Sequence, residues 1–533
     1  MSTSVRKHKA VAVAVPATIL AAVVLASCGS LPQPVAAVVT QGAQAGELTD
    51  LQACEYPPDG GEGAYDAECG TLVVPENRGK ADSRLIALPV VRIRASGSDP
   101  AAPVFLVDGG PGQSNVTWEM LPWLIERHDV VMVGYRGVDG SVKLVCPELG
   151  RSLKEHLGRD YGSDQAYEEY TAATRLCADA HVEAGVDLSS YSIPGVIEDM
   201  ESARMALGYD RINVLSRSFG TRVAQVYAYL HPDSLHRVVQ ISVNTPGYFI
   251  GDRYVLDKMI RRMSELCAAD ASCSSRTSDL ARTMYEVNRN MPGRWLFFRI
   301  DPDTVRLGVH YQFLNNANMP AVFEAYLAAA EGDYSGMAMA NLLTRILTPI
   351  DQFVYGDTFS KGGTAEMNDY GGIDSINLGD SIMGMPMSEW GWPMATSWPV
   401  ELIPEDLREL QGTDVEMLLV NGTLDFATPP DSMQAATPYF HKAQMVLLPE
   451  FSHNYDVMEL QPEAFERLTT SFYDTGVGDD SLFVYQSLSF EPGMRLTVMA
   501  KVLAAVVVVL PALLILIAVL VVRRVRRRRA IAG

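Results

Sequence analysis

The sequence lacks the cysteine and histidine patterns of a metal site. Its 533 residues contain seven cysteines and nine histidines, with no C-x-x-C pair and no histidine at ligand spacing from two cysteines. No convincing internal repeat is present. We therefore expect neither a bound metal nor a cofactor.

Positive charge is also scarce. The chain has 43 Lys and Arg against 64 Asp and Glu. Eleven of these basic residues lie in 1–27 and 495–533, which contain no acid, so 32 basic residues remain and the part between the ends carries a formal charge near −32. Such a surface argues against nucleic acid as a partner.

Long charge-free apolar runs occur only at the two ends. Residues 1–28 carry three basic residues, Arg6, Lys7 and Lys9, ahead of an apolar run from Ala10 to Leu25, and close with L-A-S-C at Cys28. This order predicts a secretory signal, and the closing tetrapeptide resembles a lipobox, in which Cys28 becomes the lipidated N-terminus. The alternative is an uncleaved anchor with an incidental cysteine.

The second run, Val502 to Val522, has 21 uncharged residues interrupted only by Pro511, and R-R-V-R-R-R-R follows it. A run of that length crosses a bilayer, and the arginines are expected to stay in the cytoplasm. The chain between the two anchors then lies on the extracellular face of the cell membrane. A buried core helix is disfavoured because nothing polar marks a second face.

Six cysteines remain after Cys28. An even number in an oxidising compartment suggests disulfides, although six thiols allow 15 pairings. We favour the sequential set because each bond closes a short loop: Cys54 with Cys69, Cys146 with Cys177, and Cys267 with Cys273.

Short apolar or β-branched runs recur along the chain and alternate with helical patterns. The runs are 88–95, 103–107, 129–134, 212–216, 237–242, 415–420 and 444–448, and helices are expected at 194–208, 219–230 and 319–334. Several runs are apolar throughout, as strands covered on both faces are. The alternation predicts an α/β fold with a mostly parallel sheet.

Residues 246–400 do not show this alternation of strands and helices. They contain helical stretches and a passage rich in Gly, Met and Trp, which predict a cap inserted between strands and folded over the sheet edge. The expected organisation is a signal peptide at 1–28, a flexible tether at 29–50, core segments at 51–245 and 401–490 around the cap, and a transmembrane helix with a basic tail at 491–533.

The frame Ser216-Arg217-Ser218-Phe219-Gly220 places a serine between small residues where a strand is expected to turn into a helix. A serine hydroxyl needs a histidine to take its proton, an acid to hold that histidine, and donors for the oxyanion. Alone, S-x-S-x-G is a weak motif, and a structural turn is the better interpretation of it.

The other parts of such a site follow expected strands. D-G-G-P-G at 108–112 offers the amides of Gly109 and Gly110, which would hold an oxyanion together with the amide of Phe219. Asp425 and His453 each follow a late strand, in the chain order serine, acid, histidine. A lone Asp or His in a loop is usually solvated surface. Four independent parts in the right order make a catalytic triad of Ser218, Asp425 and His453 the better interpretation.

Five segments together resemble a known family: D-G-G-P-G, V-G-Y-R-G-V-D-G-S, S-R-S-F-G-T-R-V-A-Q-V-Y-A-Y-L-H-P-D, L-D-F-A-T-P-P and F-S-H-N. They are similar to the proline iminopeptidase and tripeptidyl aminopeptidase branch of the alpha/beta hydrolases, peptidase family S33, over about residues 51–475. The resemblance implies an exported serine hydrolase that removes residues or short peptides from a free peptide N-terminus through an acyl-enzyme on Ser218. It also implies that the Phe219 and Gly110 amides hold the oxyanion.

The sequence departs from the family pattern at Asp108, where the family has His, and at Ser216-Arg217 in the nucleophile frame. Asp108 adds a negative charge near the proposed oxyanion hole, and Arg217 is a candidate to offset it. Two other functions stay open: a carboxylesterase acting on lipids or small esters, and a cell-surface binding protein that has lost turnover.

An aminopeptidase must bind a free ammonium, for which acidic cap residues are suited. The candidates are Glu366, Asp369, Asp374, Asp380 and Glu389, although acids are so common in this chain that a solvated face is the better account of any one of them. The cluster of Trp390, Trp392 and Trp398 either lines a pocket or packs the cap, and we favour packing.

Overall fold

The structure is a computed structural model that describes residues 37–58, 63–119, 121–248, 251–350, 353–367 and 376–532. The expected signal peptide and Cys28 lie outside the described residues, as do Asp369 and Asp374 of the cap.

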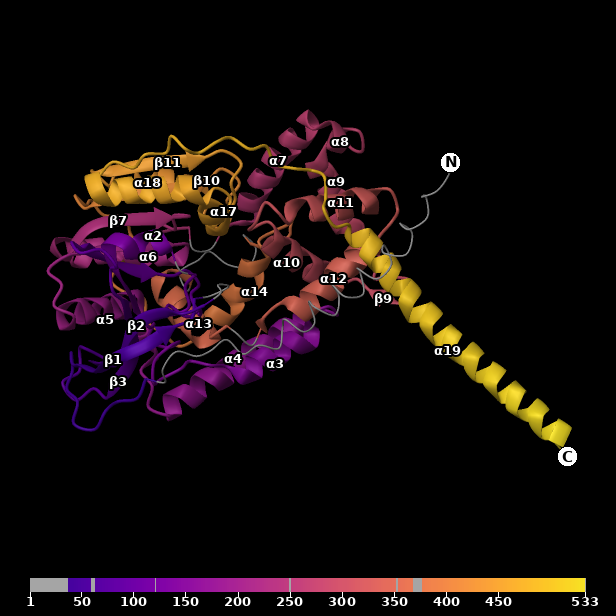
Figure 1. The fold of residues 1–533 in the computed structure, drawn as a ribbon, viewed down its shortest axis with the longest axis horizontal. Coiled ribbons are helices and arrows are strands. Elements are labelled where there is room, and N and C mark those ends of the chain that lie inside the picture. Colours follow the sequence, from indigo (N-terminus) through magenta and orange to yellow (C-terminus); the bar gives the residue numbers. More distant parts are fainter. Residues whose placement is uncertain are drawn as a thin grey trace, which may run out of the picture.

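A nine-stranded sheet forms the centre of the molecule (Figure 1). Its strand order is β1-β2-β3-β5-β4-β6-β7-β10-β11; the six strands from β5 to β11 are parallel, and β1, β2 and β3 join them antiparallel. The strands are β1 (Leu48–Tyr56), β2 (Tyr65–Pro75), β3 (Leu85–Ile93), β4 (Ala101–Val107), β5 (His128–Val133), β6 (Ile212–Arg217), β7 (Leu235–Ile241), β10 (Glu416–Gly422) and β11 (Ala443–Leu448).

All seven predicted runs are strands of this sheet, but β1 and β2 were not predicted. β1 lies at the sheet edge and is mostly exposed, so it shows no apolar run that would reveal it. It begins at Leu48, and the Gly46 amide already donates to the Val73 carbonyl at 2.8 Å. The end of segment 29–50, which was expected to be a flexible tether, is therefore hydrogen-bonded to the sheet.

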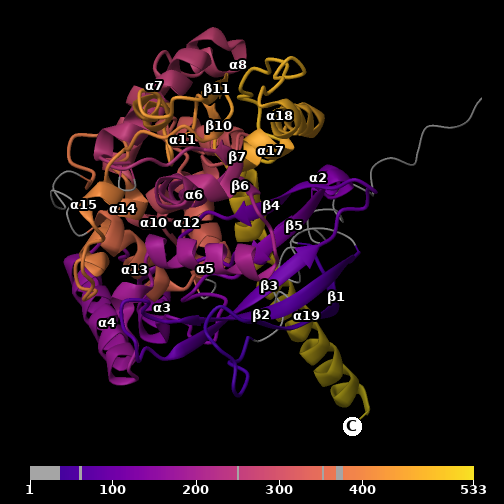
Figure 2. The same cartoon turned by 90° about the vertical axis from the view of Figure 1, so that its left-hand side faces the viewer.

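Helices cover both faces of the sheet (Figure 2). On one face lie α5 (Ile193–Ala206), α6 (Phe219–Leu230) and α16 (Pro430–Ala436); on the other lie α2 (Pro122–Arg127), α17 (Asn454–Glu459) and α18 (Pro462–Thr475). Neighbouring residues of one strand enter opposite cores: Val238 packs in the first cluster and Val239 in the second. The strands are buried on both faces, which explains their continuous apolar sequences.

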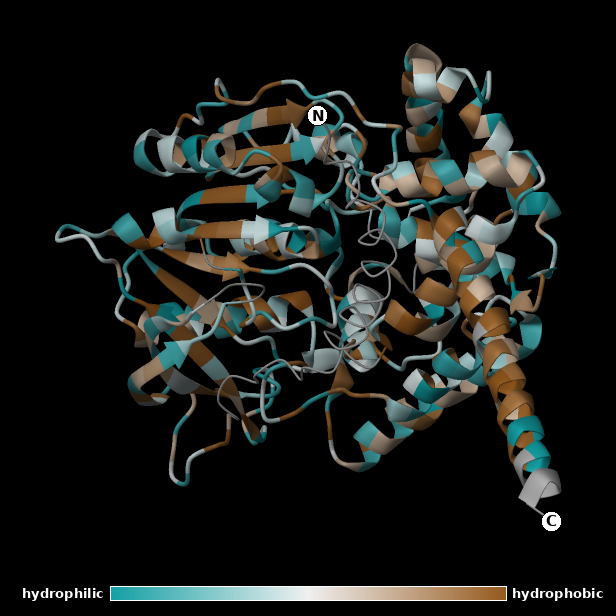
Figure 3. Cartoon of the chain, turned by 45° about the vertical axis from the view of Figure 1, so that its right-hand side comes forward, coloured by the Kyte–Doolittle hydropathy of each residue, from teal (hydrophilic) through white to brown (hydrophobic). Residues whose placement is uncertain are grey.

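The segment between β7 and β10 is largely helical and has an apolar core of its own. In Figure 1 it lies beside the sheet, and in Figure 3 the arrowheads of the strands point towards it. It contains α7 (Arg253–Ala269), α8 (Ala271–Ser274), α9 (Leu280–Asn290), a hairpin of β8 (Arg294–Trp295) and β9 (Phe298–Arg299), α10 (Pro302–Gln312), α11 (Met319–Ala330), α12 (Ser335–Leu347), α13 (Tyr355–Ala365) and α14 (Pro386–Ala395). We call this segment the cap.

Two helices between β5 and α5 extend the cap, which was not predicted. They are α3 (Pro147–His156) and α4 (Asp164–Glu183), and α4 packs against α14. The remaining short elements are η1 (Leu188–Ser190), η2 (Pro232–Ser234) and α15 (Glu405–Arg408).

The disulfides are the sequential pairs that short loops predicted. Cys54 bonds Cys69 between β1 and β2, Cys146 bonds Cys177 between α3 and α4, and Cys267 bonds Cys273 between α7 and α8. Their Cα atoms lie 5.8, 5.4 and 5.2 Å apart, within the usual range.

The chain ends in a helix, α19 (Leu496–Ala532), which is longer than the predicted span. Residues 496–527 are long and apolar enough to cross a membrane. Figure 3 shows α19 as hydrophobic over most of its length and hydrophilic near its end. Its first turns pack on α11 and α12 and bury Thr497, Ala500 and Ala504.

Candidate active site

Ser218 stands on the sharp turn between β6 and α6. Its φ of 52° is in the left-handed region, which is rare for a serine and typical of a strained nucleophile turn. Gly220 is required here, because a Cβ at this position would lie 2.2 Å from the Val107 carbonyl oxygen. Ser216 fits where the family has glycine, since its hydroxyl donates to the Val239 carbonyl at 2.9 Å.

The structure brings the three predicted side chains together in a hydrogen-bonded row. His453 follows β11 and Asp425 follows β10. The His453 Nε2 lies 3.0 Å from the Ser218 hydroxyl, and its Nδ1 lies 2.8 Å from an Asp425 carboxylate oxygen. Nucleophile, base and acid are therefore within hydrogen-bonding reach of one another across more than two hundred residues of sequence.

Asp425 is fully buried, yet it is held as a carboxylate. The Thr428 amide and hydroxyl donate to its two oxygens at 2.9 and 2.8 Å. Burial alone raises the pKa of Asp425, but the charge and hydrogen bond of His453, with the Thr428 amide, outweigh it and hold the pKa below its usual value. An ionised Asp425 fixes the Nδ1–H tautomer of His453, which leaves Nε2 free to accept the serine proton.

The loop after β4 approaches Ser218 closely but offers fewer amides than predicted. A Cβ on Gly109 would lie 3.0 Å from the Ser218 Cβ, which explains the glycine. The Gly109 amide, however, donates to the Asp108 carboxylate at 2.5 Å, so the prediction that it serves the oxyanion is wrong. Gly110, with φ of 109°, makes no hydrogen bond through its amide within the described chain, and its role in the oxyanion hole stays a prediction.

Asp108 does not leave an uncompensated charge beside the nucleophile. The Arg217 guanidinium binds its carboxylate through two bonds of 2.7 and 3.0 Å, binds Glu119 at 2.5 Å, and stacks 4.1 Å above the Trp118 ring. Burial lowers the pKa of Arg217, but the carboxylate of Asp108 outweighs it and raises the pKa overall. Two departures from the family pattern thus form one buried ion pair.

Residues of the cap also hold this loop. Asp357, on α13, accepts the Gly112 amide at 3.0 Å and pairs with the fully buried Lys361. Lys361 donates in turn to the Arg136 carbonyl at 3.1 Å. Sequence reasoning missed this contact because α13 lies about 250 residues after the loop.

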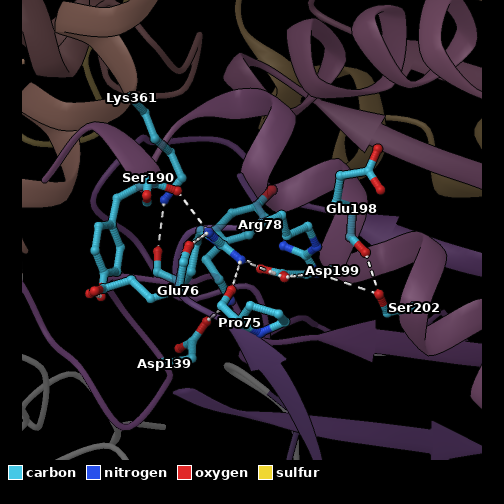
Figure 4. A network of polar contacts seen from close by, with 12 residues as sticks. Pro75, Glu76, Arg78, Asp139, Ser190, Glu198, Asp199, Ser202 and Lys361 are labelled. Atoms are coloured by element: carbon cyan, nitrogen blue, oxygen red, sulfur yellow. Dashed lines mark hydrogen bonds and ion pairs between the residues drawn. The ribbon is translucent and has the colours of Figure 1, made fainter. Parts of the chain in front are cut away.

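Arg136 anchors the V-G-Y-R-G segment beneath the site. It is 1% exposed and makes two bonds of 2.7 Å to Asp199 on α5. Figure 4 shows Asp199 in this network with Arg78, which also binds it, and Glu76, whose carbonyl accepts from Arg136. The motif is therefore explained by support of the core rather than by contact with substrate.

Two further titratable groups lie next to the triad. His310, on α10, is buried, its Nδ1 has no hydrogen-bond partner among the described residues, and its ring faces the Phe426 ring at 4.8 Å. Burial, with the nearby charge of His453, lowers the pKa of His310 to about 3. This imidazole is therefore neutral.

Asp456, one turn after His453, accepts the amides of Ser452 and Asn316 and binds no cation among the described residues. Burial raises the pKa of Asp456 to about 6, against the amide bonds that lower it. The folded chain thus binds this proton more tightly than the unfolded chain, so its contribution to stability is complete at low pH and is lost as pH rises through about 6.

Asp456→Asn is expected to stabilise the folded protein at pH 8 by about 2 kcal/mol and to have little effect at pH 4. The asparagine oxygen keeps the two amide bonds and removes the buried charge. Thermal unfolding of both proteins in detergent across this pH range measures the difference. An equal effect at both pH values would show that charge is not the cause.

Three of the five predicted ammonium-binding acids are described. Glu389 binds Arg306 through two bonds of 2.7 and 2.8 Å and ties α14 to α10, whereas Asp380 is exposed and accepts from Tyr254. Glu366 accepts the Gly247 amide at 2.8 Å. The tryptophans pack the cap, as favoured: Trp390 and Trp398 are buried, and Trp398 donates to Ser360.

Within the described chain, Cys146, Cys177 and His181 form one grouping of potential metal ligands. Both sulfurs are bonded to each other, so neither supplies a thiolate.

Comparisons with known proteins agree with this geometry. The sequence model of a family described as having the alpha/beta hydrolase fold matches residues 102–455. The chain is 29% identical to tripeptidyl aminopeptidase of Streptomyces coelicolor over 192 residues, 34% of this chain and 36% of that protein. It is 27% identical to serine protease Hip1 of Mycobacterium tuberculosis over 183 residues, 32% and 35% of the two chains. The chain thus spans about a third of the length of these relatives.

Among solved structures, a proline iminopeptidase-related protein of Thermus thermophilus is 14% identical, with a TM-score of 0.33 over 76% of this chain and 98% of that one. A thermophilic esterase from Thermogutta terrifontis is 14% identical, with a TM-score of 0.34 over 76% and 99%.

Proposed function

Because the chain belongs to the alpha/beta hydrolase family, we propose that it is a serine peptidase that releases residues or short peptides from free peptide N-termini. The row from Ser218 through His453 to Asp425 carries the hydrolase part of the proposal. The similarity to tripeptidyl aminopeptidase supports the peptidase part.

In the first chemical step, the Ser218 oxygen attacks the carbonyl carbon of the scissile peptide bond while His453 Nε2 takes the hydroxyl proton. Asp425 stabilises the imidazolium that forms. The amide of Gly110 and the amide that follows the nucleophile, that of Phe219, hold the negative oxygen of the tetrahedral intermediate. His453 then gives its proton to the leaving amine, and a water molecule hydrolyses the acyl-enzyme by the same path.

Selection of a free N-terminus needs an acceptor for the substrate ammonium close to the nucleophile. Among the described cap acids, Glu389 is neutralised by Arg306 and Asp380 lies at the solvent. Glu366, which follows α13 and accepts the Gly247 amide, stays a candidate for this role.

For location, we propose that the protein is exported and held at the outer face of the cell membrane. Lipid on Cys28 and the span of α19 supply the anchors, and the arginine cluster after Val522 stays in the cytoplasm.

The test is a panel of chromogenic peptides of one to four residues, each with a free and with an acetylated N-terminus, and simple aryl esters. We expect cleavage of the free peptides and a loss of at least about 100-fold on acetylation, because acetylation removes the positive charge of the substrate N-terminus. Equal rates on free and blocked peptides, or activity on esters alone, would contradict the proposal.

A further inference from the structure

A cavity of about 570 Å³ lies on the cap, away from the triad, and four arginines line it: Arg159, Arg294, Arg299 and Arg345. It is bounded by the loop after α3, the β8–β9 hairpin and one side of α12. The one acid in its lining, Asp160, accepts a hydrogen bond from His156 at 2.8 Å.

None of these four guanidiniums makes an ion pair or hydrogen bond within the part of the chain that the structure describes. The chain has 64 acids, and other exposed arginines of the cap, such as Arg276 and Arg282, are paired with acids. Four unpaired guanidiniums around one cavity are therefore not a consequence of a shortage of carboxylates. Their forked donors suit phosphate or another oxyanion.

The hairpin places two of them in direct opposition. Arg294 and Arg299 are cross-strand partners, and like charges in this arrangement destabilise a hairpin unless an anion lies between them. The pair therefore indicates an anionic ligand more strongly than scattered surface arginines would.

The hairpin turn itself is apolar and strained. Its two turn residues are Leu296, which has φ of 52°, and Phe297; their exposed fractions are 65% and 46%. Two-residue turns of this kind favour Asn-Gly. Ile346 and Leu347, at the end of α12, add exposed apolar surface on the helix that carries Arg345.

Both the hairpin and α19 pack on α12. The charge-free run of α19 begins at Val502, whereas Ala504 is still buried in the protein and Lys501 binds Asp333 at 2.6 Å. The cap is thus held where α19 would enter the bilayer, at the depth of the lipid headgroups.

We propose that the cap has a binding site for an anionic lipid headgroup of the outer leaflet: the four arginines bind its phosphate, and Leu296 and Phe297 enter the interface beside it. Arginines beside exposed apolar residues are the combination by which proteins lie on anionic membranes. The site fixes the orientation of the catalytic domain on the membrane, which a single helix leaves free to tilt.

The experiment compares amide hydrogen exchange of residues 293–300 in the full chain, inserted in nanodiscs. One set contains phosphatidylcholine only, and in the other about a third of the lipid is phosphatidylglycerol. We expect about tenfold slower exchange of the hairpin with phosphatidylglycerol. Arg294→Gln with Arg299→Gln removes this difference, while the matched control, Arg175→Gln with Arg261→Gln, keeps it, because those two exposed arginines also make no hydrogen bond or ion pair with the described residues but lie outside the cavity.

A second variant, Leu296→Asn with Phe297→Gly, supplies a favoured turn sequence and so keeps the hairpin folded; it is expected to lose most of the protection. Equal exchange in the two lipid mixtures, or full protection in Arg294→Gln with Arg299→Gln, would overturn the proposal. The proposal would also be overturned if inorganic phosphate or a soluble acidic peptide, added to phosphatidylcholine discs, protected the hairpin as much as phosphatidylglycerol does. The cavity would then bind a soluble ligand. Hydrolysis by all these variants should match the wild type, so failure here is separable from failure of the proposed activity.

Discussion

Ser218→Ala is expected to reduce kcat on the best peptide of the panel by about a millionfold, to the level that substrate binding and the oxyanion amides alone provide. The hydroxyl is the atom that forms the acyl bond, and nothing else in the described site replaces it. Its hydrogen bond within the described chain is to His453, so removal should change the stability of the fold by less than about 1 kcal/mol.

The matched control is Ser202→Ala, which removes a serine hydroxyl that bonds a helix carbonyl on α5. It should keep full activity. Substantial turnover by Ser218→Ala, with an unchanged melting temperature, would mean that a different group is the nucleophile.

Asp425→Asn is expected to slow turnover by about four orders of magnitude while leaving substrate affinity nearly unchanged. An asparagine amide directs an N–H towards His453 Nδ1, which favours the tautomer with the proton on Nε2. That nitrogen then faces the Ser218 hydroxyl as a donor and cannot take its proton. Single-turnover kinetics on a chromogenic peptide separate this loss from any change in binding.

Asp431→Asn is the control for this substitution. Asp431 lies on α16 and binds Lys258 at the surface, so its loss should leave kcat within about twofold. A loss of less than tenfold for Asp425→Asn would show that the acid does not set the tautomer of His453, and that the triad geometry has another purpose.

The sequence was sufficient to locate the triad because each member follows a strand whose apolar run is plain. Parallel strands bring their carboxyl ends to one edge of the sheet, so Ser218, Asp425 and His453 meet once the order of strands is right. The pairing of the six cysteines after Cys28 could also be predicted, since pairs close in sequence form the shorter loops.

The rest of the site depends on side-chain directions that periodicity does not encode. Asp108 and Arg217 are 109 residues apart, and only their contact shows that one neutralises the other and that Asp108 occupies the Gly109 amide. The edge strand β1 was missed because exposure on the sheet edge removes the apolar signal. The support that Asp357 gives to the oxyanion loop required knowing how the cap sits on the sheet.

The most direct test of the central claim, that Ser218 is an activated nucleophile, is labelling of the folded full chain with a fluorophosphonate probe, followed by peptide mapping. We predict one adduct, on Ser218, that disappears on denaturation before labelling and in His453→Ala. A folded protein that carries no adduct on Ser218 would contradict the account and favour a binding protein on a hydrolase scaffold.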